Sequence, residues 1–326
     1  MKAMILAAGY GTRLFPLTVD RTKPAIPLLG KPLVGYVAEY LAEFGIEDVI
    51  VNLHHQPESV KQALGDGSDF GVRIHYTLEQ PSILGTAGAL DNARDHLIDD
   101  TFLIINGKIV TDIDINAAVE AHRSSGAVAT MVLKENSRRE SFSEVYVESS
   151  RVTGFGDLAD PNGKGDLPLM FTGIHILEPS VFEYIPRGVY SDIVPTFYNP
   201  AIRKGEMIGA HLTNANWFEL STIPRYLEIS LKLLNGSAER MVVGRNPRIA
   251  RDARLDDSVL WDNVTIEEGA TVERSIIGDD VVVRRGDVLR DVAIVRREMI
   301  DSFGAIPEKA LKGEIVGENY IVSLTQ

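Results

Sequence analysis

A glycine-rich turn near the N-terminus is the first stretch whose residue types are suited to chemistry. Gly9 and Gly11 flank Tyr10 directly after a short apolar run, and Arg13 follows closely. Glycines let backbone N–H groups approach an anionic ligand, because no side chain blocks the way. Such a turn alone often serves only packing, but Arg13 adds a guanidinium suited to phosphate oxygens and Lys23 adds a second cation. Two cations beside a glycine turn in an acidic chain predict a phosphate-binding site.

The composition limits the classes of protein to which the chain can belong. It has 326 residues, of which 44% are hydrophobic and 24% charged, as in ordinary globular proteins. With 33 Lys and Arg against 46 Asp and Glu, the net charge is −13, so we expect neither a nucleic-acid nor a membrane partner. The absence of Cys excludes disulfides, thiolate nucleophiles and Cys-ligated zinc, and it suits a cytoplasmic location. No segment approaches the roughly 20 apolar residues of a membrane helix.

The first half of the chain alternates short apolar runs with amphipathic ones, which predicts repeated strand–helix–strand units. We therefore expect an α/β fold with a Rossmann-like, mostly parallel sheet and helices on both faces. The expected strands are Lys2–Ala7, Asp48–Leu53, Arg73–Leu78, Phe102–Ile105 and Val128–Lys134. The expected helices are Leu33–Phe44, Glu58–Leu64, Ala87–Leu97 and Asn116–Ser124.

From about residue 140 the pattern changes to antiparallel additions, and an amphipathic helix, Pro224–Leu234, closes at Asn235-Gly236. After that helix, apolar residues recur at every sixth position: Val264, Ala270, Ile276, Val282, Val288 and Ile294. This period is typical of a parallel β-helix, here of about two coils, although ordinary β-hairpins are the alternative. We expect a boundary near residue 238, with a domain at 1–238 and a short β-helix at 239–326.

The glycine turn lies in a longer motif that resembles a family signature. From Leu6 the sequence reads Leu-Ala-Ala-Gly-x-Gly-Thr-Arg-Leu-x-Pro-Leu-Thr, followed by Lys-Pro at Lys23. This motif resembles that of the sugar-1-phosphate nucleotidyltransferases, or nucleoside-diphosphate-sugar pyrophosphorylases. Leu84–Leu90 looks like their nucleotide-side loop, especially in mannose-1-phosphate guanylyltransferases, and Phe171–Ile174 resembles the strand that lines their sugar pocket. A C-terminal left-handed β-helix is also common in this family.

The resemblance implies attack of a sugar 1-phosphate oxygen on the α-phosphorus of a nucleoside triphosphate, with pyrophosphate leaving. Arg13 and Lys23 would be catalytic by neutralising phosphate charge. The nucleotide-binding residues that the resemblance implies are Leu6, Ala7, Ala8, Gly9, Gly11, Thr12, Arg13, Lys23, Glu79, Gly85, Thr86, Asn106 and Gly107. On the sugar-phosphate side they are Thr172, Gly173 and Trp217.

The sequence departs from the family at the metal and sugar-phosphate residues. Family members carry Asn-Gly-Asp where this chain has Asn106-Gly107-Lys108, and Trp-x-Asp-x-Gly-Thr where it has Trp217-Phe218-Glu219-Leu220-Ser221-Thr222. Their magnesium-binding aspartates are therefore replaced by Lys108 and Glu219, so that the family's Mg²⁺ is in doubt here. A family Gly appears as Ser143, and Gly154-Phe155-Gly156-Asp157 stands near the place of Glu-Lys-Pro. Lys164 is nearby, but nothing assigns it a role.

Lys108 admits two interpretations. Two aspartates plus Mg²⁺ sum to zero charge, as do Lys108 and Glu219 without metal, so the lysine would act as a built-in cation. Alternatively, Lys108 points to solvent and the loop has drifted. Asp112 and Asp114 are two further candidate metal ligands, but acids also collect at helix N-termini, and we favour that explanation.

Two functions fit these residues. The first is a sugar-1-phosphate nucleotidyltransferase with an altered metal site, using a nucleoside triphosphate and a sugar 1-phosphate. The second is a catalytically impaired relative that binds a nucleotide or nucleotide-sugar and regulates a partner. Gly9–Arg13 and Lys23 fit both functions, whereas Lys108, Glu219 and Ser143 favour the second. An intact nucleotide loop in a whole fold favours the first. The base, the sugar and the oligomeric state, including a homo-oligomer, stay open.

Overall fold

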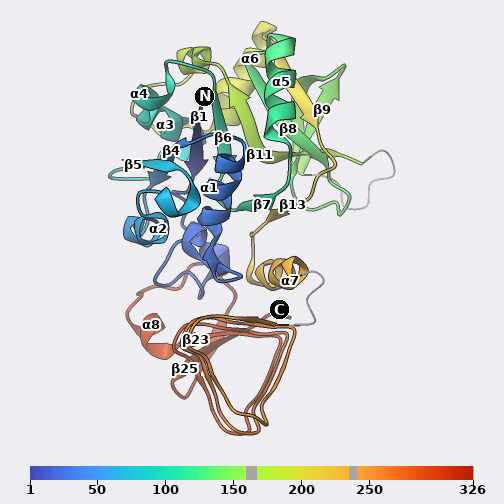
Figure 1. Cartoon of the computed structure of the whole chain (residues 1–326). Coiled ribbons are helices and arrows are strands. Elements are labelled where there is room, and N and C mark those ends of the chain that lie inside the picture. Colours follow the sequence, from blue (N-terminus) through green and yellow to red (C-terminus); the bar gives the residue numbers. More distant parts are fainter. Residues whose placement is uncertain (159–166, 235–240, 326) are drawn as a thin grey trace. The chain divides into compact units, whose positions relative to one another are not determined.

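The computed structural model describes residues 1–158, 167–234 and 241–325 (Figure 1). The chain divides into two compact units. The first unit consists of Met1–Gly9, Val37–Pro57 and Leu64–Trp217. The second consists of Tyr10–Tyr36, Glu58–Ala63 and Phe218–Gln326. Lys164, the helix stop at Asn235-Gly236 and the boundary at residue 238 lie outside the described residues, so the division into 1–238 and 239–326 stays a prediction.

The first unit is built on a sheet with nine strands among its described residues, in the order β5-β4-β1-β6-β11-β8-β12-β10-β9. The strands are β1 (Lys2–Leu6), β4 (Asp48–Leu53), β5 (Arg73–Leu78), β6 (Phe102–Asn106), β8 (Ala129–Glu135), β9 (Ser143–Glu148), β10 (Arg151–Leu158), β11 (Leu169–Leu177) and β12 (Ile208–Leu212). The block from β5 to β6 is parallel, as predicted from its strand–helix alternation. Beyond it, β11 pairs antiparallel with β6 and β8, and β9 and β10 form an antiparallel pair.

Helices cover both faces of this sheet. Ala87, Ala89 and Leu90 of α3 share a buried cluster with Met4 and Met131. On the opposite face α5 packs against β8, β11 and β12, where His122 Nδ1 lies 2.9 Å from Thr130 Oγ1. The helices are α1 (Leu33–Glu43), α2 (Pro57–Leu64), α3 (Gly85–Asn92), α4 (Arg94–Leu97), α5 (Ile115–Ser125), α6 (Asn199–Lys204), α7 (Ile223–Leu233) and α8 (Arg297–Asp301).

The predicted single helix Ala87–Leu97 is wrong. The helix breaks at Ala93, whose φ of −100° and ψ of 5° leave the helical region, so that α3 and α4 are separate. None of the helices in the described part of the chain has the length and hydrophobicity that a membrane span requires. Four short strands complete the region before the coils: β2 (Pro27–Leu28), β3 (Lys31–Pro32), β7 (Ile109–Thr111) and β13 (Trp217–Glu219).

The second unit contains a parallel β-helix, drawn as stacked triangular coils in Figure 1. Its described residues form three coils and the start of a fourth, rather than the two predicted. Their strands are β14 (Met241–Val243), β15 (Arg248–Ile249), β16 (Arg254–Asp256), β17 (Ser258–Leu260), β18 (Thr265–Ile266), β19 (Thr271–Glu273), β20 (Ile276–Ile277), β21 (Val282–Val283), β22 (Val288–Arg290) and β23 (Val292–Arg296). Equivalent strands of successive coils pair in parallel, as β17 does with β14 and β20.

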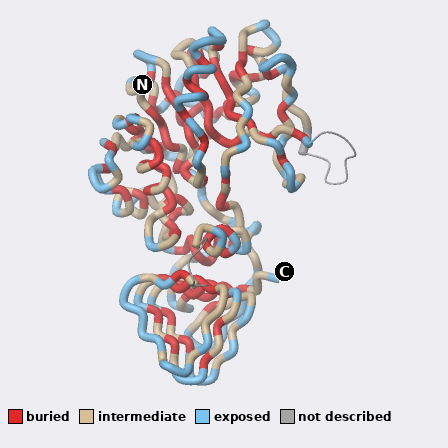
Figure 2. The backbone as a smooth tube through the Cα atoms, turned by 45° about the vertical axis from the view of Figure 1, so that its right-hand side comes forward, coloured by how far each residue is buried: buried red, intermediate tan, exposed pale blue. Residues whose placement is uncertain are grey.

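The six-residue period is correct for part of the β-helix and wrong for the rest. Val264, Ala270, Ile276 and Ile294 are buried, but Val288 is 58% exposed. The reason is the coil length: equivalent residues of neighbouring coils are 17 positions apart, as in the contact of Asn263 with Asp280. A strict count in sixes assumes 18 residues in each coil, so the predicted inward positions move one residue too far in the next coil. Val281 and Val283 are therefore buried instead of Val282. Figure 2 shows the alternation of buried and exposed positions along the coils.

The second unit is completed at both ends of the β-helix. Helix α7 packs against β14 and β17 of the first coils. After the last coil, β24 (Gly313–Val316) and β25 (Asn319–Ser323) form a hairpin, and β25 pairs antiparallel with β23.

Candidate active site

The carboxyl ends of β1 and β6 bring two predicted regions together in the first unit, and the end of β4 lies beside them. In the parallel register, Leu6 lies opposite Asn52 on one side and Asn106 on the other. The glycine turn that starts after Ala7 therefore leaves the sheet beside the Asn106-Gly107 turn. Ligands of open α/β sheets bind outside the carboxyl ends of the strands.

A buried hydrogen-bond chain ties the start of the glycine turn to the predicted nucleotide loop. Ala7 N donates to Asn52 Oδ1 at 2.8 Å, and Asn52 Nδ2 donates to Glu79 Oε1 at 2.6 Å. The other oxygen of Glu79 accepts from Leu84 N at 2.6 Å. Glu79 is only 1% exposed. Both of its carboxylate oxygens thus hold protein groups, and Asn52, which sequence reasoning missed, is the link. Its one signal was a polar residue inside the buried strand Asp48–Leu53.

The start of α3, predicted to contact the nucleotide, is capped by another part of the chain. Ser191 O accepts hydrogen bonds from Ala87 N at 2.8 Å and Gly88 N at 3.1 Å. The hydroxyl of Thr86 lies 3.4 Å from Asp192 Oδ1 and accepts from Ile193 N at 2.8 Å. These amides and this hydroxyl are therefore engaged within the unit. The backbone of Leu84 is engaged as well, because its N–H donates to Glu79 and its carbonyl accepts from Ser191 N at 2.9 Å. Any backbone contact of this loop with a ligand therefore falls to Gly85, and nothing in the sequence indicated the cap.

Two glycines hold the Asn106-Gly107 turn against its neighbours. Gly107 N donates to Leu6 O at 2.9 Å, and a Cβ at Gly107 would lie 3.0 Å from that same oxygen. Gly173 has a φ of +83°, and a side chain there would collide with the amide of Asn106. The backbone that carries Lys108 is consequently fixed beside the end of β1.

The three residues predicted for the sugar-phosphate side lie together. Thr172 is fully buried, and its hydroxyl donates to Val132 O at 2.8 Å. Trp217 Nε1 donates to Thr172 O at 2.8 Å, which fixes the indole against the strand that contains Gly173. The hydroxyl of Thr172 thus bonds within the sheet.

His175, on the same strand, is the titratable group closest in sequence to Gly173. Burial lowers its pKa to about 3, and its Nδ1 lies 2.6 Å from the hydroxyl of Tyr198. The imidazole is therefore neutral near pH 7.

Four predicted nucleotide-binding residues lie in the second unit, namely Gly11, Thr12, Arg13 and Lys23, whereas Ala8 and Gly9 belong to the first. Gly11 has a φ of 66° and begins a 3-10 turn, Thr12–Leu14, with Leu14 N donating to Gly11 O at 2.9 Å. A Cβ at Gly11 would lie 3.4 Å from Cβ of Lys23, so the glycine turn and Lys23 are neighbours. Arg13 is exposed and forms no ion pair with any residue that the structure describes. An exposed guanidinium next to a glycine turn and a lysine is suited to phosphate.

The residues present do not fit a resident magnesium ion, although members of this kind of family generally use Mg²⁺. Asp112 accepts two hydrogen bonds from Asn216, at 2.6 and 2.7 Å, and Asp114 caps α5 by accepting from Ala117 N at 3.1 Å. Lys108 offers an ammonium, which cannot coordinate a cation. Among the described residues, no group of three or more His, Asp or Glu side chains is placed to hold a metal.

Glu219 is buried at the end of β13, in the second unit, whereas Lys108 belongs to the first. Their pairing stays a prediction. Ser143 begins β9 and is exposed, and Gly154-Phe155-Gly156-Asp157 lies within β10.

With this geometry in place, the comparisons with known proteins decide the family. A profile described as Nucleotidyl transferase matches residues 2–236. The chain belongs to the nucleotidyl transferase family. It is 31% identical over 291 residues to a UTP–glucose-1-phosphate uridylyltransferase of Synechocystis sp., covering 82% of this chain and 72% of that protein. It is 34% identical over 233 residues to an N-acetylmuramate α-1-phosphate uridylyltransferase of Neisseria meningitidis, covering 70% and 96%.

A mannose-1-phosphate guanylyltransferase of Mycobacterium tuberculosis is 28% identical over 301 residues, covering 83% of each chain. A second profile, described as GlmU-like, C-terminal hexapeptide, matches residues 231–290 and supports the left-handed β-helix. A solved structure of a putative glucose-1-phosphate thymidylyltransferase from Bacillus anthracis has the same fold, with a TM-score of 0.62 and 22% identity over 73% of this chain and 97% of that one.

Loss of the Asn52 link should destabilise the protein. In Asn52→Ala, Ala7 N loses its acceptor and buried Glu79 loses a donor, so the free energy of unfolding should fall by about 1–3 kcal/mol. Asn214→Ala, at an exposed asparagine of the same unit, is the control and should change stability by no more than about 0.5 kcal/mol. Denaturant unfolding of both variants measures the difference. Equal stabilities would mean that the buried chain contributes nothing.

Proposed function

We propose that this protein transfers a nucleotidyl group from a nucleoside triphosphate to a sugar 1-phosphate and releases pyrophosphate. The observation that carries the proposal is the intact glycine turn with Arg13 and Lys23, in a chain that belongs to the nucleotidyl transferase family. The buried link from Ala7 through Asn52 and Glu79 to Leu84 supports it, because it orders two predicted nucleotide segments against each other.

In this reaction a non-bridging oxygen of the sugar phosphate forms a bond to the α-phosphorus of the triphosphate. The bond from that phosphorus to the oxygen that bridges to the β-phosphorus breaks, and pyrophosphate leaves with the electron pair. No covalent enzyme intermediate is needed, so the protein contributes mainly by positioning and by stabilising phosphate charge. Arg13 and Lys23 would supply this stabilisation, and backbone groups at Gly9, Gly11 and Gly85 would hold the nucleotide.

We propose that Lys108 takes over the function of the metal-binding aspartate that family members have at this position. Its ammonium would face the α-phosphate as a resident cation, with buried Glu219 as its counter-charge when the nucleotide is absent. Magnesium would then enter only with the triphosphate substrate. An ammonium supplies charge but not the geometry with which a metal orients two phosphates, so turnover should be slow.

The base and the sugar are best found by screening. The three relatives described above carry names with three different combinations: uridylyl with glucose, uridylyl with N-acetylmuramate and guanylyl with mannose. We expect pyrophosphate release in a panel of four ribonucleoside triphosphates and dTTP, each with glucose, mannose and N-acetylated sugar 1-phosphates. Release that needs both substrates supports the proposal, whereas no release from any pair would leave the alternative of a nucleotide-binding, regulatory relative.

We also expect the protein to act in the cytoplasm, where nucleoside triphosphates are available and a chain without Cys needs no oxidising compartment.

A further inference from the structure

The segment that carries Arg13 and Lys23 is packed with the β-helix. Tyr10–Tyr36 belongs to the same compact unit as the coils, although the preceding strand β1 belongs to the other unit. The rings of Phe15 and Phe303 are 5.2 Å apart, and those of Phe15 and Tyr320 are 6.2 Å apart. The segment is therefore attached to the C-terminal part of the chain directly after Arg13.

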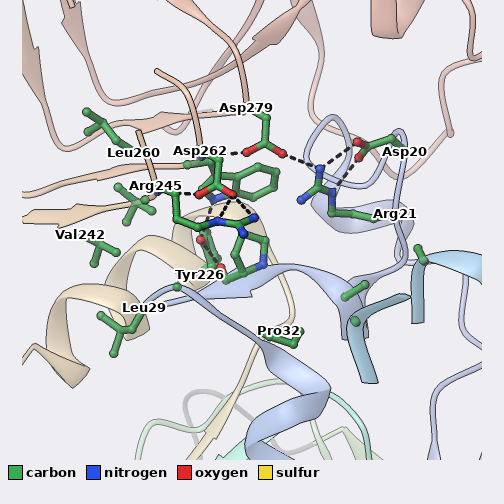
Figure 3. Close-up of a pocket in the computed structure, with 18 of the residues that line it drawn as sticks. Asp20, Arg21, Leu29, Pro32, Tyr226, Val242, Arg245, Leu260, Asp262 and Asp279 are labelled. Carbon is green, nitrogen blue, oxygen red and sulfur yellow. Dashed lines mark hydrogen bonds and ion pairs between the residues drawn. The ribbon is translucent and has the colours of Figure 1, made fainter. Parts of the chain in front are cut away.

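A second attachment precedes Lys23 and is centred on Arg21 (Figure 3). The guanidinium donates twice to Asp20, at 2.8 Å each, and once to Asp279 at 2.5 Å. It also lies over the ring of Trp261, 4.9 Å from the centroid. Asp279 and Trp261 belong to successive coils, and the other oxygen of Asp279 accepts from Asp262 N at 2.9 Å. Arg21 is thus fixed by two carboxylates and an indole.

A third attachment follows Lys23. Trp261 Nε1 donates to the hydroxyl of Tyr226 at 2.9 Å, and that hydroxyl donates to Pro27 O at 2.6 Å. Both aromatic residues are buried, and burial raises the pKa of Tyr226 well above its ordinary value, so the phenol keeps the proton that it donates. Lys23 is consequently held between two points, Arg21 and Pro27, which are both tied to Trp261.

We propose that Arg21 is a positioning residue, through which the coils at Trp261 and Asp279 hold Lys23 and the adjoining glycine turn in the geometry that binds phosphate. Arg21 does not itself bind the nucleotide, because its donors are directed at Asp20 and Asp279. The network lines one wall of a cavity of about 510 Å³, which leaves room for the segment to shift when the attachment is cut. This inference rests on the proposed function, since it assigns Lys23 to phosphate.

The test uses Arg21→Ala, Arg21→Lys and Asp279→Asn in the full chain. The matched control is Arg274→Ala, which removes a similar ion pair between coils, with Asp291 at 2.6 Å, outside the Tyr10–Tyr36 segment. The first readout is hydrogen exchange of the amides of Thr22, Ala25 and Ile26, which donate to Ser59 Oγ, Thr22 O and Lys23 O respectively. Arg21→Ala and Asp279→Asn should accelerate this exchange at least tenfold, because they open the segment. The exchange rate of Arg21→Lys should lie between the rates of these variants and that of wild type.

The second readout is the affinity for α,β-methylene analogues of the four ribonucleoside triphosphates and of dTTP, measured by calorimetry. Arg21→Ala and Asp279→Asn should weaken binding about tenfold or more, because small displacements of a charge-bearing segment are costly. Arg274→Ala should leave both readouts as in wild type. Unchanged exchange in Arg21→Ala, or faster exchange with unchanged affinity, would overturn the positioning role.

The two readouts also separate this inference from the proposed function. If wild type binds none of the five analogues, the proposed function fails and the assignment to nucleotide binding fails with it. The exchange experiment still decides, in that case, whether the coils order the segment.

Discussion

Replacing Lys108 with aspartate should give the protein a magnesium requirement that wild type lacks. In wild type, a resident ammonium at the carboxyl end of β6 would neutralise the α-phosphate, so chelation should change nucleotide affinity by no more than about threefold. In Lys108→Asp, two carboxylates would repel the phosphate unless a divalent cation joins them, and binding should then collapse in chelator. With magnesium present, this variant should release pyrophosphate faster than wild type.

Removal of the charge is the second half of this experiment. Lys108→Ala should weaken nucleotide binding by about 1.5–3 kcal/mol, or about tenfold to more than hundredfold, because the proposed α-phosphate site then loses its resident cation. The turn itself should persist, since Gly107 and Gly173 fix its backbone. Lys204→Ala, at an exposed lysine of the same unit, is the control. If chelator abolishes nucleotide binding by wild type, or if Lys108→Ala binds nucleotide as tightly as wild type, Lys108 does not replace the metal. It would then be a neutral substitution in a loop that has lost its metal.

Arg13→Ala should weaken triphosphate binding by about 1.5–3 kcal/mol, the usual contribution of a hydrogen bond between charged groups. The guanidinium is exposed, lies beside the glycine turn and has no ion pair with the described residues that would compete for it. Arg13→Lys should recover part of the affinity, because it keeps the charge and loses the paired donors. Calorimetry on these variants and on Arg251→Ala, an exposed arginine of the β-helix, measures the effect. Equal affinities would mean that the glycine turn is only structural.

The strands of the first half were predictable because they depend on local periodicity. Asp48–Leu53 and Arg73–Leu78 have the bounds that the apolar pattern predicts, and the parallel pairing follows from their alternation with helices. The β-helix was also predictable as a class. The length of its coils, 17 residues, was not predictable. A coil that is one residue shorter changes the register of the buried positions but not the kinds of residue that occupy them.

The candidate site was predictable in its residues but not in its connections. Capping of α3 joins Thr86 to Asp192, which are 106 positions apart, and no local pattern reports such a contact. Grouping of Tyr10–Tyr36 with the coils likewise depends on Arg21 and Asp279, 258 positions apart. In the sequence, the adjacent residues Asp20 and Arg21 look like an ordinary exposed ion pair of a loop. Their contact with Asp279 is visible only in the structure.

Nucleotidyl transfer is tested most directly by identifying the products that contain the α-phosphorus and the γ-phosphorus of the triphosphate. The triphosphate of the active pair would be labelled with ³²P at the α-phosphorus in one reaction and at the γ-phosphorus in another, with unlabelled sugar 1-phosphate. We predict α-label in a nucleoside-diphosphate sugar, γ-label in pyrophosphate, and loss of both products in Arg13→Ala. Both labels remaining in intact triphosphate, or γ-label released as inorganic phosphate without a sugar product, would contradict nucleotidyl transfer.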